Sequence, residues 1–464
     1  MNENENKLAT APVGKLLFGL ALPAIAAQIV NLLYNMVDRI YIGHIPETGA
    51  LALTGLGVAF PIIILIAAFS ALFGFGGAPR ASIEMGRGNH DNAEEIMGNS
   101  FAALVAAGLI LTVVFSVFAD PLLYLFGASE STIVYASGYL KIYVLGSVFV
   151  LITTGMNAYI TSQGFAKTAM CTTLIGAGLN IVLDPIFIFG FKMGVQGAAL
   201  ATILSQAVSA VWVTKFLTGK KTILKIKKKY LRIRPAVIGP IMALGISPFI
   251  MQSTESLISV CFNTSLLKYG GDVAVGSMTI LTSVMQFAMM PLHGVTQGMQ
   301  PIVSFNYGAK NMDRVRKAFK ITLITCLLYT TVIWAAVQLM PETFARIFSN
   351  EEELIAFSAW ALRIYLGAIC LFGAQIACQQ TFVSLGKAVH SLFLAVLRKI
   401  ILLIPLIYIL PAIMEDKLLA VFMAEPIADF LAVVSTVTLF MFTVGKLLRK
   451  EKNGEIGNRN ITEV

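Results

Sequence analysis

Two stretches of this chain repeat one another, "PRASIEMGRGNHD" at 79–91 and "PIVSFNYGAKNMD" at 301–313. Their proline, glycine, asparagine and aspartate residues match at a constant shift of 222 positions. The same shift aligns three further pairs, Phe126 with Phe348, Lys141 with Arg363, and Ser162 with Ser384. One shift held over about 85 residues predicts an internal duplication of the whole fold.

The composition places most of the chain in lipid. Of 464 residues, 57% are hydrophobic and 13% are charged, with a mean hydropathy of +0.80, which exceeds what a soluble core needs. A bilayer helix takes about 20 apolar residues, and the runs are too long and too irregular in alternation for barrel strands. We therefore predict an all-α polytopic membrane protein with about twelve transmembrane helices, near 15–42, 49–77, 95–119, 133–163, 168–190, 195–217, 236–266, 273–299, 318–340, 354–383, 390–412 and 417–446.

The duplication divides these helices into two six-helix repeats. A repeat with six spans starts and ends on the same side, so the two copies are parallel and related by an axis along the membrane normal. Two such lobes leave a central cleft that can open to either side, which favours a carrier over a receptor or an enzyme. The expected organisation is an N-terminal tail (1–14), a first lobe (15–217), a basic linker (218–235), a second lobe (236–446) and a C-terminal tail (447–464).

Positive charge predicts the orientation. With both termini in the cytoplasm, the inward segments hold 25 Lys and Arg residues, nine of them in 215–234, and the outward loops hold four. Short cytoplasmic loops carry this excess. The net charge of +9 then reflects topology and contact with anionic lipid, and not nucleic-acid binding, because the basic run joins two membrane helices. The first apolar run lacks a positive leader, so we interpret it as an uncleaved helix.

Several chemistries find no support in the sequence. The five cysteines lie in apolar runs without CxxC spacing, which argues against disulfides and zinc, and the four histidines show no metal spacing. Neither a Walker motif nor a Ser-His-Asp or HExxH arrangement is present. We therefore expect neither an enzyme nor a bound cofactor.

Five motifs carry a family resemblance: "NMVDRIYIG" (35–43), "LDPIFIFG" (183–190), "GVQGAALAT" (194–202), "GISPFIMQ" (245–252) and "PIVSFNYGAKN" (301–311). They resemble the MATE (multidrug and toxic compound extrusion) family, and within it the multidrug export protein A subgroup, from about residue 15 to 446. The resemblance implies a twelve-helix multidrug efflux transporter of the cell membrane. Such a transporter exports amphipathic, often cationic compounds by antiport with H⁺ or Na⁺; we expect it to be monomeric.

Asp184 is an acid in an apolar run, where an ionised carboxylate is costly and normally has a functional partner. Asn180 lies one helical turn earlier on the same face, and Pro185 predicts a kink beside it. Asp38 in the first helix and Thr202 in the sixth are expected at a similar depth in the membrane. Two carboxylates, an amide and a hydroxyl suit either a proton or Na⁺.

The resemblance implies that a cation-coupling site is formed by Asp38, Asn180, Asp184, Thr202 and Asn157. The alternative is structural: Asn180 and Asp184 would fix a kink, and Asp38, followed by Arg39, would mark the membrane interface. At the shift of 222, Asn180 and Asp184 fall on Leu402 and Leu406. A generic requirement of the fold would appear in both lobes, so this difference favours coupling.

Glu255 is the main acid expected on the substrate side, as a partner for cationic compounds or in a structural hydrogen bond. Glu425 and Asp429 share a helix face and could line the cleft or pair with Arg398 and Lys399. Further candidates for substrate contact are Gln28 and Tyr34, and Met285 and Met289 on the eighth helix, where methionines serve either adaptable binding or ordinary packing.

One other transport function remains open. A flippase for lipid-linked oligosaccharides would need a strongly cationic cavity for pyrophosphate, whereas the helices here carry acids and few interior bases. The sequence does not decide between H⁺ and Na⁺, since the same oxygen ligands serve both.

Overall fold

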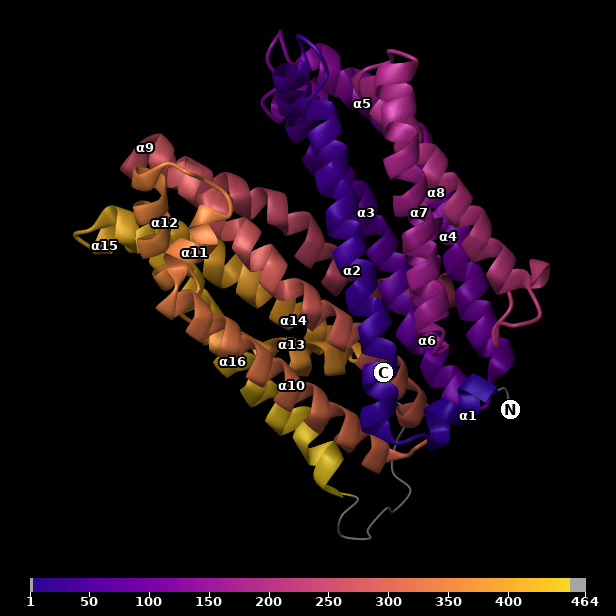
Figure 1. The fold of residues 1–464 in the computed structure, drawn as a ribbon. Helices are drawn as coiled ribbons and strands as arrows, with labels where there is room; N and C mark the ends of the chain where they lie inside the picture. The colour runs from indigo at the N-terminus through magenta and orange to yellow at the C-terminus, as the bar shows by residue number, and fades with distance from the viewer. Residues whose placement is uncertain (1–2, 451–464) are drawn as a thin grey trace.

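The structure is a computed structural model that describes residues 3–450 (Figure 1). Every regular element in that range is helical, and the expected all-α fold is confirmed. The elements are α1 (Glu3–Thr10), α2 (Val13–Gly43), α3 (Gly49–Gly86), α4 (His90–Leu125), α5 (Ile133–Leu145), α6 (Ser147–Ser162), α7 (Ala166–Pro185), η1 (Ile186–Gly190), α8 (Val195–Thr218), η2 (Lys228–Tyr230), α9 (Pro235–Gly308), α10 (Met312–Leu339), α11 (Pro341–Arg346), α12 (Glu352–Tyr365), α13 (Ile369–Ser384), α14 (Ala388–Val396), η3 (Leu397–Leu403), α15 (Ile404–Ile413) and α16 (Lys417–Lys450).

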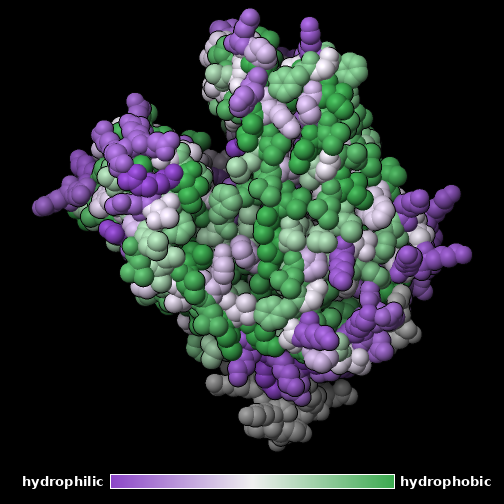
Figure 2. Space-filling model, viewed as in Figure 1, coloured by the Kyte–Doolittle hydropathy of each residue, from purple (hydrophilic) through white to green (hydrophobic). Residues whose placement is uncertain are grey.

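The helices form two lobes arranged as a V. Figure 1 shows α2–α8 on one side and α9–α16 on the other, meeting at the end that carries α1 and separating toward the opposite end. The surface is hollowed between the two arms, and hydrophobic residues cover the faces between hydrophilic ends (Figure 2). The central cleft is therefore open at the end opposite α1.

The described helices account for the expected membrane spans. Nine are long and apolar enough to cross a bilayer, and two bent pairs bring the number to eleven. Helix α9 has 74 residues, which at 1.5 Å per residue is about 110 Å, nearly four times a bilayer core of ~30 Å. It is interrupted at Gly271, where φ is 64° and ψ −160°. Dividing α9 there gives the twelve spans that hydropathy predicts.

Two expected spans are broken helices. The run 133–163 bends by 59° between α5 and α6, and the run 354–383 bends by 50° between α12 and α13. The first break lies at Gly146, where an added Cβ would be 2.3 Å from Ile203 of α8. Ala368, the residue that matches Gly146 at a shift of 222, is the N-cap of α13. The break thus belongs to the repeated unit.

Matched hydrogen bonds confirm the duplication at atomic level. In the N-terminal lobe the Ser82 hydroxyl donates to the Ser162 carbonyl oxygen at 3.3 Å. In the C-terminal lobe the Ser304 hydroxyl donates to the Ser384 carbonyl oxygen at 2.7 Å. Donor and acceptor are each displaced by 222 residues. The bond therefore joins equivalent helices in the two lobes, α3 with α6 in the first and α9 with α13 in the second.

The lobes meet through glycine at the closed end of the V. A Cβ on Gly86 would lie 2.0 Å from the Phe305 carbonyl oxygen, and a Cβ on Gly308 would lie 2.0 Å from that of Ile83. The shift of 222 relates Gly86 to Gly308 and Ile83 to Phe305, so it converts one contact into the other. The two contacts therefore lie on either side of the axis that relates the repeats. Small residues allow such backbone contact between membrane helices, and only glycine fits here.

The N-terminal segment is a docked helix. The Leu8 carbonyl oxygen of α1 accepts from Asn306 Nδ2 and from Arg314 Nη2, each at 3.0 Å. Glu5 Oε1 lies 3.4 Å from His90 Nε2 of α4. Helix α1 therefore contacts both lobes at the closed end of the cleft.

The basic linker is folded onto the N-terminal lobe. Gln163 Oε1 accepts from Thr222 Oγ1 and from the backbone N–H groups of Ile223 and Leu224, at 2.7–2.9 Å. Further along, the Arg234 backbone N–H donates to Asn99 Oδ1 at 2.7 Å. Acids of α4 pair with linker bases, Glu94 with Lys227, and Glu95 with Arg234.

We predict that Gly86→Ala destabilises the protein, because the added methyl group meets a backbone carbonyl that side-chain rotation cannot move. Overpacking of this kind costs about 1–3 kcal/mol. The control is Gly57→Ala on the same helix, where nothing lies within 4 Å of the new Cβ. Thermal unfolding of the detergent-solubilised protein should show a lowered Tm for Gly86→Ala alone. Equal Tm values for the two variants would contradict the tight contact.

Candidate functional site

Four of the five predicted coupling residues lie together in the N-terminal lobe. Asn180 Nδ2 donates to Asp184 Oδ1 at 3.1 Å and lies 3.3 Å from Thr202 Oγ1. The carboxyl groups of Asp38 and Asp184 interact directly with one another. All four residues are buried, Asp184 completely. Helices α2, α7 and α8 thus bring one polar cluster, the N-lobe cluster, into an apolar interior.

The end of α7 positions Asp184. Asn180 and Asp184 are one turn apart, which aligns amide and carboxylate. Helix α7 ends at Pro185, and the chain continues as the π-helical turn η1, in which the Phe191 N–H donates to the Ile186 carbonyl oxygen at 2.8 Å. Proline clashes with the preceding turn, and the wider π-helical turn that follows is a feature often found at functional sites.

The N-lobe cluster contains three acceptor oxygens with no hydrogen-bond partner among the described residues. They are Asp38 Oδ1, Asp184 Oδ2 and Asn180 Oδ1, all fully buried. An unsatisfied buried acceptor typically costs about 1–3 kcal/mol. Two ionised carboxylates in contact also repel one another until a positive charge lies between them. A proton or a metal cation would satisfy the oxygens and remove the repulsion.

Tyrosines complete the surroundings of the N-lobe cluster, and two of them were not predicted. Tyr139 and Tyr143 of α5 are buried and stacked, with ring centroids 5.9 Å apart. Tyr139 interacts with the Thr202 hydroxyl and lies close to Asp38. Tyr34, which was predicted as a substrate contact, also lies close to Asp38. Tyr139 and Tyr143 are spaced i, i+4 in "GYLKIY", and this spacing is the sequence signal that places both rings on one helix face.

Asn157 lies apart from the other four. Its Nδ2 donates to the Ala169 carbonyl oxygen at 3.2 Å, at the start of α7, whereas Asp184 lies at the end of that helix. Fifteen residues of α-helix span about 22 Å. The structure therefore does not bring Asn157 into the N-lobe cluster.

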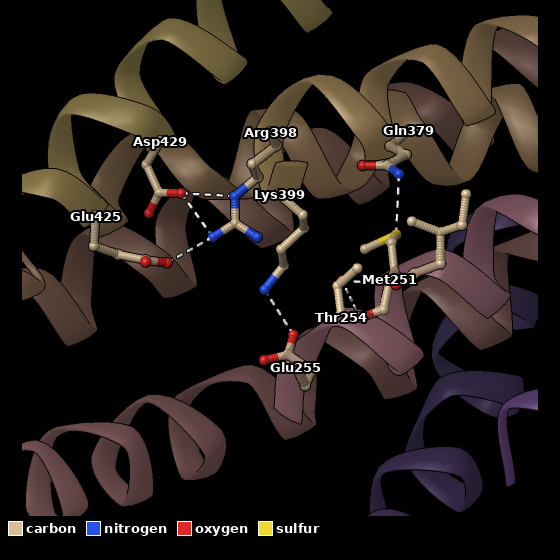
Figure 3. A network of polar contacts seen from close by, with 9 residues as sticks. Met251, Thr254, Glu255, Gln379, Arg398, Lys399, Glu425 and Asp429 are labelled. Atoms are coloured by element: carbon tan, nitrogen blue, oxygen red, sulfur yellow. Dashed lines mark hydrogen bonds and ion pairs between the residues drawn. The ribbon is translucent and has the colours of Figure 1, made fainter. Parts of the chain in front are cut away.

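The C-terminal lobe contains a second polar group, which we call the C-lobe cluster: Glu255, Arg398, Lys399, Glu425 and Asp429. Arg398 lies between two acids of α16, with Nε 2.7 Å from Asp429 Oδ1 and Nη2 3.0 Å from Glu425 Oε1 (Figure 3). Lys399 Nζ extends the other way and donates to Glu255 Oε1 at 2.6 Å. The predicted pairing with Arg398 is confirmed, but Lys399 pairs with Glu255 and not with the two acids of α16.

A π-helical segment presents both bases to the interior. Arg398 and Lys399 are consecutive residues of η3, and both are buried, while the Arg398 guanidinium lies 4.5 Å from the ring centre of Phe372. Two adjacent bases in an apolar run were the sequence signal for this cluster, although the sequence does not show which acid each base contacts.

Glu255 occupies the exposed side of the C-lobe cluster. Its side chain is 55% exposed, whereas that of Lys399 is 8% exposed. Both halves of α9 flank it, since Glu255 lies close enough to His293 of the second half to interact electrostatically. Among the other predicted contacts, Met289 is buried, and Met285, Gln28 and Tyr34 are half-buried.

Two six-helix repeats around a cleft, with buried carboxylates in each lobe, define a membrane transporter. The MatE family model matches residues 23–186 and 248–409. The chain therefore belongs to the MATE family of multidrug efflux transporters.

Known proteins resemble the chain over nearly its whole length. It is 24% identical over 420 residues to the multidrug export protein MepA of Staphylococcus haemolyticus, covering 90% of this chain and 92% of that one. A MATE family transporter solved in an outward-facing conformation is 22% identical with a TM-score of 0.89, covering 97% and 99%. A structure described as "protein A" is 35% identical with a TM-score of 0.88, covering 96% and 98%.

We predict that Arg398→Met is strongly destabilising, because it removes the base with which buried Glu425 and Asp429 both form ion pairs. Breaking a buried ion pair in this way costs about 3–5 kcal/mol. The control is Arg346→Met, which removes an equally short pair with Glu352 at the surface, where such pairs are worth about 0–1 kcal/mol. Thermal unfolding compares the two. An Arg398 variant as stable as the Arg346 variant would show that the pair is not structural.

Proposed function

We propose that this protein is a secondary active multidrug exporter of the cell membrane, which moves amphipathic, often cationic compounds outward in exchange for H⁺ or Na⁺. The observation that carries the proposal is the set of three buried oxygens on Asp38, Asn180 and Asp184 that have no hydrogen-bond partner in the described part of the chain. A site that lacks only a positive charge is what a coupling cation requires. The names of the MepA relatives support export of several drugs.

The orientation follows from charge. The linker 219–234 and α1 lie at the closed end of the V, and the linker's bases belong on the cytoplasmic side by the positive-inside rule. Both termini are then cytoplasmic, and the open end of the cleft faces outward. The conformation described is the one that releases substrate and takes up the coupling ion.

Coupling follows from the charge of the N-lobe cluster. A cation from outside satisfies the three oxygens, and this lowers the cost of closing the outer end around them. The lobes then rock about the glycine contacts at Gly86 and Gly308, so that the cleft opens inward. Loss of the cation to the cytoplasm restores the repulsion between Asp38 and Asp184, and substrate binding accompanies the return. The free energy of the ion gradient thus drives export.

Residues of the cleft wall, mainly Glu255 and Met285, recognise the substrate. The side chain of Glu255 is half-exposed, and we place its carboxylate at the cleft, where it suits a cationic group. Met285 lies on the second half of α9, where a flexible thioether adapts to different apolar shapes. These features support broad selection of amphipathic cations. The bases expected of a pyrophosphate flippase are here neutralised, since Arg398 and Lys399 are both paired with acids.

We predict that Asp184→Asn abolishes ion-driven transport while leaving the protein folded, because an amide cannot alternate between charged and neutral forms. The measurement is uptake of a fluorescent cationic dye into inverted vesicles, with ΔpH and a Na⁺ gradient imposed separately. The control is Asp120→Asn, which makes the same chemical change at a half-exposed acid paired with Lys141.

The gradient that drives uptake by the wild type identifies the coupling ion. Full pumping by Asp184→Asn would contradict the coupling role. If folded wild-type protein moved no dye under either gradient, the antiport proposal would fail and the flippase would take its place.

We predict that Glu255→Gln weakens transport of cationic substrates by about tenfold, as expected for the loss of ~1.4 kcal/mol of charge pairing. Neutral substrates should change little, because they gain nothing from the carboxylate. The KM values of a cationic and a neutral dye in the same vesicles measure the difference, with Glu353→Gln at an exposed position as control. An equal loss for both dyes would assign Glu255 a structural role instead.

A further inference from the structure

The acid best placed to receive a cationic substrate already holds a cation. Lys399 Nζ lies 2.6 Å from Glu255 Oε1. The acid is the exposed partner of this pair and the lysine is the buried one. A substrate therefore reaches Glu255 before it reaches Lys399, and Figure 3 shows the Lys399 ammonium group directed at the Glu255 carboxylate.

The other two acids of the C-lobe cluster do not offer an alternative to the substrate. Arg398 is 2.7 Å from Asp429 Oδ1 and 3.0 Å from Glu425 Oε1. Both acids and the arginine are buried, and the planar guanidinium is held against Phe372. A planar guanidinium held in this way is less mobile than the lysine of the same cluster. Lysine, by contrast, carries a point charge on a flexible chain.

We propose that Lys399 is a tethered competitor of cationic substrates: it holds Glu255 in the empty cleft and releases it when a substrate cation binds. The inference rests on the proposed export of cationic compounds and assigns a residue that sets selectivity among them. A cation must displace the ammonium group before it gains the carboxylate. A neutral amphipath has no such competitor.

The displaced lysine has a second partner within the cluster. Glu425 Oε2 is buried and has no hydrogen-bond partner among the described residues, and Lys399 lies close enough to Glu425 to interact with it electrostatically. A lysine that leaves Glu255 can therefore move toward Glu425 within the cluster. This avoids the large cost of an unpaired buried charge.

The charge of the cluster also matches a bound cation. With all five groups ionised, three acids face two bases, which leaves one negative charge. A monovalent cation on Glu255 brings the acids and the cations to equal numbers. The cluster is thus built to be neutral when a cationic substrate is present, with Lys399 moved toward Glu425.

The test measures binding to the purified full-length protein in nanodiscs by equilibrium dialysis. The probes are tetraphenylphosphonium, a monovalent cation, and triphenylphosphine oxide, a neutral compound of related shape. Lys399→Met keeps the length and apolar stem of the side chain but removes its charge. We expect the variant to bind the cation about tenfold more tightly and the neutral probe with unchanged affinity, whereas Lys399→Arg should retain the wild-type preference.

A double-mutant cycle tests the second partner. Glu425→Gln should weaken cation binding when Lys399 is present, because the displaced ammonium group then has nowhere to go. In the Lys399→Met background the same change should have a smaller effect. Neutral-probe binding reports in each case whether the cleft is intact.

Three results would overturn the proposal: an unchanged cation affinity in Lys399→Met, an equal loss for both probes, or equal effects of Glu425→Gln in the two backgrounds. If these occur while wild-type vesicles still transport dye, the tethered competitor fails and the export function stands. If the wild type neither binds the cation nor transports dye, the proposed function fails, and this inference fails with it.

Discussion

The close contact of backbone with backbone where the lobes meet is the constraint on which the rest of the fold depends. Gly86 and Gly308 each lie against a carbonyl oxygen of the other lobe, and no larger residue fits in either place. Because the two contacts exchange under the same shift that relates Ser82 to Ser304, the junction is symmetric about the axis between the repeats. The lobes stay in backbone contact from these glycines as far as Leu72 and Gly245, and beyond that stretch the helices are free to diverge, which creates the cleft.

The shared scaffold carries two different kinds of polar cluster. In the N-terminal lobe, Asp38 and Asp184 interact with each other and form no ion pair with a base among the described residues, and acceptor oxygens there have no hydrogen-bond partner within residues 3–450. In the C-terminal lobe, Arg398 and Lys399 are both paired with acids, two bases against three carboxylates. The second cluster therefore contains most of the positive charge it needs, and the first does not. The repeats supply equivalent positions, and the lobes differ chemically because Leu402 and Leu406 stand where the first repeat has Asn180 and Asp184.

The sequence predicted the fold well because hydropathy and a constant shift are properties of whole segments. It also predicted the N-lobe cluster, since the spacing of Asn180 and Asp184 aligns them on one face whatever surrounds them. It did not predict the breaks at Gly146 and Ala368, which depend on packing against another helix. The pairing of Lys399 with Glu255 depends on how far the lysine side chain reaches. The separation of Asn157 from Asp184 depends on the depth of each residue in the membrane. Neither property is encoded in local spacing.

The linker has a mechanical consequence. Thr222, Ile223 and Leu224 are held by Gln163, and Arg234 is held by Asn99, both residues of the N-terminal lobe. The segment is therefore fixed to that lobe near both of its ends in the folded state. A slack tether would let the lobes slide or separate, and its ordering would add an entropic cost to every movement. In the rocking motion proposed above, a connection held to one lobe as far as Arg234 favours rotation of one lobe against the other over translation.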